Sequence, residues 1–266
     1  MPSYAPHKPA AAAATAVALL LAAAAAPPAQ AQATNPSATG ACAPTTGGAD
    51  ACGPNGSEAW LNSGLDDPAS GWNPPFLDIN GLTHISLDEY YAGVGAPCQQ
   101  YDAAFQASGD KYGIDPAVLA FIAMQESSCN ADAGSPTPGL MQCSPGNCQN
   151  GQDQCQYPVE DNVDCGAWYL QQQLAASGGN AVHALGAYNG WFTAGDGGAG
   201  QNGGRGLTED YPCGDAGRAN GMPQNLDYLH QTLNGWFQGY DVYGDDAGLV
   251  GGKYACQGTC DNGGLC

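Results

Sequence analysis

A single glutamate interrupts an apolar stretch near the middle of the chain. Residues Phe121 to Asn130 read FIAMQESSCN, and Glu126 stands where the apolar pattern calls for a core residue. Desolvation of a carboxyl in an apolar setting disfavours its charged form and raises its pKa. The negative end of a helix acts in the same direction. A carboxyl that is still protonated near neutral pH can donate a proton to a leaving oxygen, so Glu126 is a candidate general acid.

The residues around Glu126 predict the helix that positions it. Asp115 is a good N-cap residue, and Pro116 suits the first helical position. Four later residues have the i, i+3, i+4, i+7 spacing of one helix face: Leu119, Ile122, Ala123 and Glu126. We therefore expect a helix from Pro116 whose apolar face ends in the glutamate.

Similar patterns predict the other helices of a mainly α domain over residues 98–240. We expect a helix from Gln99 to Gly113 with one aromatic face, Tyr101, Phe105 and Tyr112. A helix beginning near Pro158 and ended by Gly178-Gly179 has its inner face at Val163, Ala167, Leu170 and Leu174. A short helix capped by Asn180 carries Val182 and Leu185, and one opened by Pro223 points Leu226, Leu229, Leu233 and Phe237 inward. Residues 195–206 are glycine-rich and predict a flexible loop.

Short motifs follow Glu126-Ser127 along these predicted helices. They are Gly139-Leu140-Met141-Gln142, then Asn162-x-x-x-Gly166-x-x-Tyr169-Leu170, then Ala187-Tyr188-Asn189. In this order and spacing the chain resembles the lysozyme-like lytic transglycosylases of glycoside hydrolase family 23, which also holds the goose-type lysozymes. The resemblance covers roughly Gln99 to Trp236.

The resemblance implies a lysozyme-like fold and cleavage of the β-1,4 bond between N-acetylmuramic acid and N-acetylglucosamine in peptidoglycan. It implies that Glu126 is the sole acid/base. It also implies substrate-binding roles for the other motif positions, namely Ser127, Met141, Gln142, Tyr188 and Asn189. We expect Trp191 to line the same cleft, because aromatic planes stack on sugar rings. Trp168 and Trp236 are further candidates, with core packing as the alternative.

A partner acid would decide between two outcomes. Glycosidases usually pair two carboxylates, and goose-type lysozymes carry aspartates on both sides of the Gly-Leu-Met-Gln motif. Here Cys143 and Ser144 follow that motif, and Asp132 is the nearest preceding acid. We therefore favour the transglycosylase route, which forms a 1,6-anhydro sugar, over activation of a water molecule.

Two other readings remain open at this point. One is a chitin-directed glycosidase on the same fold, because chitin shares the N-acetylglucosamine unit. The other is a secreted carbohydrate-binding protein without activity. Leu140 and Met141 are also compatible with core positions, and Tyr188 and Asn189 with a packing contact and a helix cap.

Composition limits the partners and the compartment. With 25 acidic and 5 basic residues the chain has a formal charge of −20, which disfavours nucleic acid and anionic membranes as partners. Residues 1–33 have the pattern of a signal peptide, so we expect a secreted, extracellular protein. We also expect a monomer. No metal motif is present, and we expect no cofactor.

The 12 cysteines all follow the predicted cleavage point and suggest disulfides. Cys42 and Cys52 are placed to tether a loose arm that starts at Thr34, and Cys143 and Cys148 to close a short loop. We expect an irregular N-terminal extension over residues 34–97. A cysteine-rich tail over 241–266 contains Cys256, Cys260 and Cys266.

Overall fold

The structure is a computed structural model that describes residues 34–43, 51–134, 137–148, 156, 158–196, 199–215, 217, 225–246 and 250. All of them belong to one compact unit, Gln32–Cys266. The predicted signal peptide, Pro223 and the three cysteines of the predicted tail lie outside the described residues.

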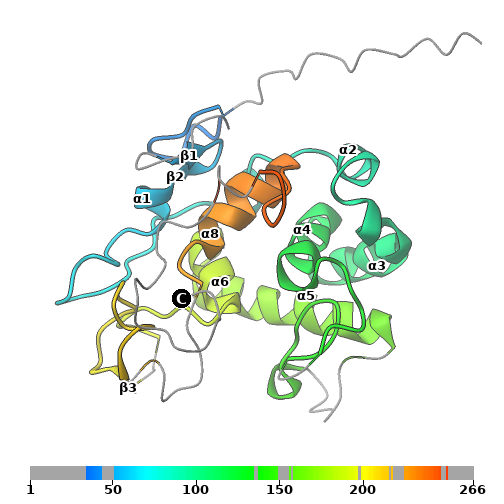
Figure 1. The fold of residues 1–266 in the computed structure, drawn as a ribbon. Helices are drawn as coiled ribbons and strands as arrows, with labels where there is room; N and C mark the ends of the chain where they lie inside the picture. Colours follow the sequence, from blue (N-terminus) through cyan, green and yellow to red (C-terminus); the bar gives the residue numbers. More distant parts are fainter. Residues whose placement is uncertain are drawn as a thin grey trace, which may run out of the picture. The chain divides into compact units, whose positions relative to one another are not determined.

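The described part is mainly helical, as the sequence predicts (Figure 1). Its N-terminal elements are β1 (Cys52–Gly53), β2 (Gly56–Ser57), α1 (Glu58–Leu61), η1 (Ile79–Gly81) and α2 (Leu87–Ala92). The central elements are η2 (Ala96–Tyr101), α3 (Asp102–Tyr112), α4 (Pro116–Ser127), η3 (Pro145–Asn147), α5 (Val159–Ala176) and α6 (Ala181–Tyr188). They are followed by β3 (Ala199–Asn202), α8 (Tyr228–His230), the π-helix η4 (Gln231–Gly235) and η5 (Trp236–Gln238). Strands β1 and β2 pair antiparallel.

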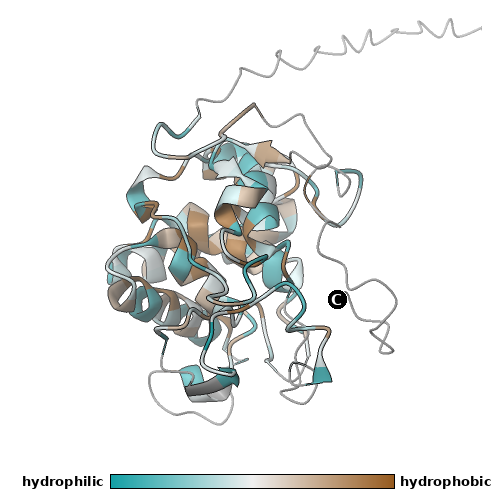
Figure 2. Cartoon of the chain, turned by 90° about the vertical axis from the view of Figure 1, so that its left-hand side faces the viewer, coloured by the Kyte–Doolittle hydropathy of each residue, from teal (hydrophilic) through white to brown (hydrophobic). Residues whose placement is uncertain are grey.

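Helix α4 is the centre of the core. Every residue from Ala117 to Gln125 is buried, as expected for a helix that is apolar on all sides. Helices α3, η4 and η5 pack against α4. Helix α5 packs against both α3 and α6 (Figure 1). Hydrophobic segments accordingly gather in the central helices (Figure 2).

The predicted boundaries are confirmed for α4, α5 and α6 and for the end of α3, whereas α3 begins at Asp102 rather than Gln99, because Ala96–Tyr101 form the 3-10 helix η2. Asp115 caps α4 by accepting a hydrogen bond from the Ala117 amide at 2.8 Å, and Asn180 caps α6 in the same way. Gly113 ends α3 in the left-handed conformation, with φ of 67°. A side chain at that φ would be strained, which explains why glycine stops this helix.

The last helical segment is less regular than the sequence indicates. Its predicted inward residues are all buried: Leu226, Leu229, Leu233 and Phe237. The backbone, however, passes from α8 through the π-helix η4 into the 3-10 helix η5. Apolar spacing alone does not reveal such a change of helix type.

The N-terminal segment, residues 34–97, is predicted to be an irregular extension, and its described residues are packed into the fold, including Asn35 and Asn55 of the predicted loose arm at its start. Residues of this segment lie in the same hydrophobic core as α4: Leu61, Leu65, Trp72, Leu77 and Tyr90. Asn35 is also buried, and its amide donates to the Gly81 carbonyl at 2.8 Å. The apolar residues of this segment have no regular period, because tertiary packing rather than a repeating helix face buries them.

Three disulfides are present in the described part: Cys42–Cys52, Cys98–Cys129 and Cys148–Cys165. The first confirms the predicted tether. The predicted Cys143–Cys148 pairing is wrong, because Cys148 bonds to Cys165 on α5. Sequence proximity favoured the shorter loop, whereas the fold brings α5 next to the segment after η3. No helix in the described part is long and apolar enough to cross a membrane.

Candidate active site

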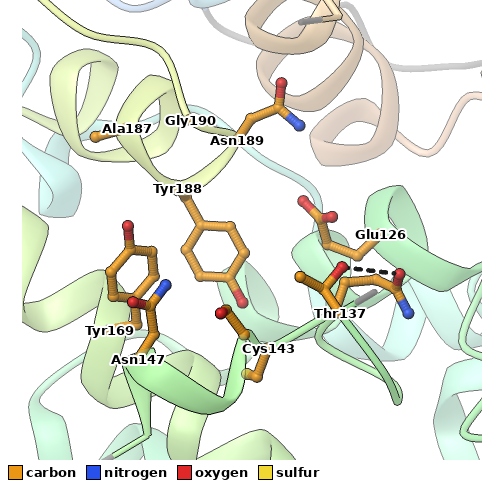
Figure 3. Close-up of a pocket in the computed structure, with 11 residues that line it drawn as sticks. Glu126, Thr137, Cys143, Asn147, Tyr169, Ala187, Tyr188, Asn189 and Gly190 are labelled. Carbon is orange, nitrogen blue, oxygen red and sulfur yellow. Dashed lines mark hydrogen bonds between the residues drawn. The ribbon is translucent and has the colours of Figure 1, made fainter. Parts of the chain in front are cut away.

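Glu126 lines a pocket of about 220 Å³. The pocket lies between the last turn of α4, the loops around η3, helix α5 and the end of α6 (Figure 3). Its lining comprises Glu126, Thr137, Gln142, Cys143, Ser144, Asn147, Tyr169, Ala187, Tyr188, Asn189 and Gly190. The Glu126 carboxyl and the Asn189 amide face one another across it (Figure 3).

The Glu126 carboxyl is in a desolvated setting with one hydrogen-bond donor. The side chain keeps some exposure toward the pocket, but protein surrounds the rest of it. Burial raises its pKa from 4.5 to about 7, against the opposing effect of the Tyr228 hydroxyl. That hydroxyl donates a 2.6 Å hydrogen bond to Oε1, which favours the charged form. Desolvation is the larger of the two effects.

Three tyrosines whose hydroxyls feel the charge of Glu126 come from three segments. Tyr188 ends α6, Tyr228 begins α8, and Tyr243 follows η5. Burial is the main cause that raises the pKa of each hydroxyl, and the charge of Glu126 adds to it. They therefore stay neutral through the titration of the glutamate, and none supplies a second charge to the site.

The Gly-Leu-Met-Gln loop is held against α4 by side chains from three helices. The Ser127 hydroxyl donates to the Leu140 carbonyl at 2.7 Å. Asn162 of α5 accepts from the Met141 amide at 2.7 Å and donates to the Pro138 carbonyl at 3.1 Å. The Tyr188 hydroxyl donates to the Met141 carbonyl at 2.9 Å. These bonds place Gln142 beside Glu126.

Two glycines of the sequence motifs are required by this close packing. Gly139 has φ of 90°, and a Cβ there would lie 2.6 Å from the Asn162 side chain. A Cβ on Gly166 would lie 2.8 Å from both the Met141 Cβ and the Tyr188 hydroxyl. The glycines thus let the loop, α5 and α6 meet behind the pocket.

The structure brings four predicted site residues together at the pocket: Glu126, Gln142, Tyr188 and Asn189. It places the other three elsewhere. The Ser127 hydroxyl faces backbone carbonyls, including that of Ala123 at 3.0 Å. Met141 is fully buried. Trp191 is 2% exposed, and its indole packs edge-on against Trp72 and donates to the Asn225 carbonyl at 3.1 Å.

None of these three residues belongs to the described pocket lining, and substrate contact by Ser127, Met141 or Trp191 stays a prediction. They support the pocket from behind rather than form its wall. Trp191 adjoins a motif that lines the pocket, but the turn at Gly190 directs its ring into the core. Trp236 is also a core residue and donates to the Gln125 side chain at 2.7 Å.

Sequence reasoning missed Tyr228, which lies 102 positions after Glu126. Its only signal was its place in a predicted helix between the inward residues Leu226 and Leu229. Nothing local indicates which helix will face the glutamate. Thr137, at a bend, and Asn147, at the end of the short 3-10 helix η3, also line the pocket, and neither carries a periodic signal.

Among the pocket-lining residues in the described part, Glu126 is the only carboxylate. Cys143 and Ser144 line the position where a second acid would follow the Gly-Leu-Met-Gln motif. Asp132 is not part of the lining.

Residues 103–203 match the family described as "Transglycosylase SLT domain". This stretch contains Glu126, Gln142, Tyr188 and Asn189. Over these residues the chain is similar to transglycosylase SLT domains. The N-terminal segment and Tyr228 lie outside the matched residues, so part of the site is built by chain beyond the match.

Solved structures of lytic transglycosylases resemble parts of the chain. A 70-kDa soluble lytic transglycosylase in complex with bulgecin A is 29% identical over 34% of this chain and 16% of its own, with a TM-score of 0.31. An inactive glutamate-to-glutamine mutant of lytic transglycosylase Slt from Pseudomonas aeruginosa is 26% identical over 50% of this chain and 24% of its own, with a TM-score of 0.31.

The soluble lytic transglycosylase Slt70 from Escherichia coli is 22% identical over 58% of this chain and 26% of its own, with a TM-score of 0.33. The chain thus spans about a quarter or less of the length of these solved proteins.

Proposed function

We propose that this protein is a secreted lytic transglycosylase that cleaves the β-1,4 bond between N-acetylmuramic acid and N-acetylglucosamine in peptidoglycan. Glu126 is its single acid/base. The observation that carries the proposal is a carboxyl of raised pKa in a pocket of an SLT domain. The matched domain supplies the reaction class, and the pocket supplies the group that performs it.

The hydrogen bond from Tyr228 determines which oxygen of Glu126 acts as the acid. Since the tyrosine hydroxyl donates to Oε1, that oxygen serves as an acceptor, and Oε2 carries the acidic proton. Glu126 gives this proton to the glycosidic oxygen, and the bond between that oxygen and C1 of the muramyl residue breaks. The leaving N-acetylglucosamine departs with a neutral 4-hydroxyl group.

The second step returns the proton. The substrate's own acetamido oxygen stabilises the electron-deficient C1, and the Glu126 carboxylate accepts a proton from the muramyl 6-hydroxyl. That oxygen bonds to C1 and closes a 1,6-anhydro ring, leaving Glu126 protonated again. The Tyr228 hydroxyl stabilises the carboxylate between the two steps, because it favours the charged form. The absence of a second carboxylate from the described pocket lining supports this route over activation of water.

Mass spectrometry of muropeptides released from purified peptidoglycan tests the proposal. We expect products that end in anhydro-muramic acid, each lighter by one water than a reducing product. Glu126→Gln keeps the side-chain shape but removes the acid, and should abolish release. Asp132→Asn, which removes an acid outside the pocket, should release products as the wild type does.

Three results would contradict parts of the proposal. Reducing ends would indicate hydrolysis by water. Cleavage of chitin oligomers in preference to peptidoglycan would support the chitin-directed alternative. Binding of glycan without release, unchanged in Glu126→Gln, would indicate a carbohydrate-binding protein. Detection of the mature protein in the culture medium, lacking its first residues, tests secretion.

A further inference from the structure

The segment that carries Tyr228 is held from behind by the N-terminal segment. Strands β1 and β2 and helix α1 lie beside α8 and η4 (Figure 1). On its other side the same segment meets α4, where Tyr228 donates to Glu126. The N-terminal segment therefore contacts the segment whose Tyr228 hydroxyl binds the Glu126 carboxyl.

Two buried asparagines make this contact specific. Asn62, which is 3% exposed, donates from its amide to the Leu226 carbonyl at 2.9 Å. Asn55, which is fully buried, donates to the Leu233 carbonyl at 2.8 Å. One carbonyl lies two residues before Tyr228 and the other five residues after it. The two amides thus fix the segment on both sides of the tyrosine.

A reciprocal pair of bonds reinforces the contact at Asn55. The Asn55 backbone amide donates to the Asn234 side chain at 2.9 Å, and the Asn234 amide donates to the Gly56 carbonyl at 3.0 Å. A Cβ on Gly53 would lie 2.4 Å from Asn234, so the hairpin and η4 meet without room for a further atom.

The π-helix η4 lets one short segment contact both α4 and the β1–β2 hairpin. Gln231 faces α4 and accepts from the Gln125 amide at 3.2 Å, whereas Asn234 faces the β1–β2 hairpin. A π turn takes more residues per turn than an α turn, so positions three apart diverge further around the axis. Both contacts then form in one short stretch.

We propose that Asn55 and Asn62 are positioning residues for the catalytic carboxyl, because they hold the segment that presents the Tyr228 hydroxyl to Glu126. The inference rests on the proposed role of Glu126 and adds to it two residues outside the matched SLT domain. They act through Tyr228 and touch no substrate.

Titration of the Glu126 carboxyl by ¹³C NMR in the full-length mature protein tests the inference without substrate. Asn62→Leu and Asn55→Leu have similar side-chain volume, add no charge and remove the amide donors. We expect each to weaken the Tyr228 bond and to raise the pKa of Glu126 by about half a pH unit. The Glu126→Gln variant assigns the signal. Asn80→Leu, at an exposed asparagine of the same segment, should leave the titration unchanged.

A double-mutant cycle asks whether the asparagines act through the tyrosine. In a Tyr228→Phe background, Asn62→Leu should not move the titration further. An additional shift there would overturn the inference, as would an unshifted titration in both asparagine variants while their thermal stability falls. Asn62→Leu removes a single hydrogen bond and serves as the test if Asn55→Leu does not fold.

The outcomes separate this inference from the proposed function. If the wild type releases no muropeptides, the proposed function fails, but the titration still reports whether Asn55 and Asn62 position Tyr228. If the wild type is active and the titration does not respond, only the positioning role is wrong.

Discussion

In the proposed mechanism the chemistry depends on one carboxyl, that of Glu126, and two opposing effects set its pKa. Burial raises the pKa of Glu126 to about 7, and the hydrogen bond from Tyr228 limits that rise. A group that must first give and then take a proton works best when its pKa lies near the working pH. A pKa of about 7 therefore suits Glu126 to both steps of the proposed mechanism.

The pH dependence of activity follows from this value. The first step needs the protonated carboxyl, so kcat/KM should fall as pH rises through about 7. The fall should approach tenfold per pH unit at higher pH, because each unit removes nine-tenths of the remaining acid. Initial rates of muropeptide release across pH 5 to 9 check it, and a rate that still climbs above pH 8 contradicts it.

Replacement of Tyr228 by Phe should move the same profile. Without the hydroxyl the charged form of Glu126 loses a donor, so its pKa rises and the alkaline limb shifts upward by about half a pH unit. The rate at the optimum should fall by about tenfold, because the carboxylate formed between the steps is less stabilised. Tyr101→Phe, at a residue outside the pocket lining, should keep the wild-type profile.

Glu126 should also make folding stability depend on pH. Its pKa rises from 4.5 in the unfolded chain to about 7 in the folded protein, so the folded state holds the proton more tightly. The contribution favours folding at pH 4.5 and below and is lost as pH rises through 7.

Glu126→Gln removes this dependence. Relative to wild type, the variant should gain free energy of unfolding between pH 4.5 and pH 8, by at most about 3 kcal/mol. The partial exposure of the side chain lowers the gain below that limit. Urea denaturation at the two pH values measures the difference, and equal offsets at both would rule the effect out.

At the scale of elements, the pocket exists because α5 and α6 both hydrogen-bond to the Gly-Leu-Met-Gln loop. Asn162 and Tyr188 bind the backbone of Met141 from two helices, and Gly166 allows them to approach. Most motif residues therefore make contacts that hold these elements together. Only some of them face the pocket.

Gly166→Ala should separate these elements. Its Cβ would lie 2.8 Å from the Met141 Cβ and the Tyr188 hydroxyl, and such overpacking costs about 1 to 3 kcal/mol. We expect a lower melting temperature together with slower muropeptide release. Gly134→Ala, where a Cβ meets nothing within 4 Å, is the matched control. Equal behaviour of the two variants would show that the close packing is unimportant.

At the scale of the molecule, the N-terminal segment is part of the folded core. Trp72 is 1% exposed and packs edge-on against His183 and Trp191. A Cβ on Gly186 of α6 would lie 2.3 Å from its ring. The segment before the matched residues is thus packed against α6, the helix that ends at Tyr188.

Trp72→Ala should destabilise the protein by about 3 to 5 kcal/mol, the typical loss for a large buried aromatic. Phe76→Ala removes an aromatic from the same segment, but Phe76 is 57% exposed. That variant should stay within about 0.5 kcal/mol of wild type. Thermal unfolding followed by circular dichroism compares the two variants. A small effect of Trp72→Ala would contradict the conclusion that the N-terminal segment is part of the folded core.

Sequence by itself determined the helices around the site and the position of Glu126 on one of them. Asp115, Pro116, Gly113 and Asn180 act through local backbone geometry, so their effects are readable from neighbouring residues. The apolar stripes of α4 and α5 are likewise local, because they depend only on helical period.

Only the tertiary structure decided what surrounds the carboxyl. It brought Tyr228 to Glu126, turned Trp191 and Met141 inward, paired Cys148 with Cys165 and built the N-terminal segment into the core. Each of these depends on contacts between residues far apart in the chain. Such contacts follow from how elements of particular shape pack against one another, and no short stretch of sequence contains that information.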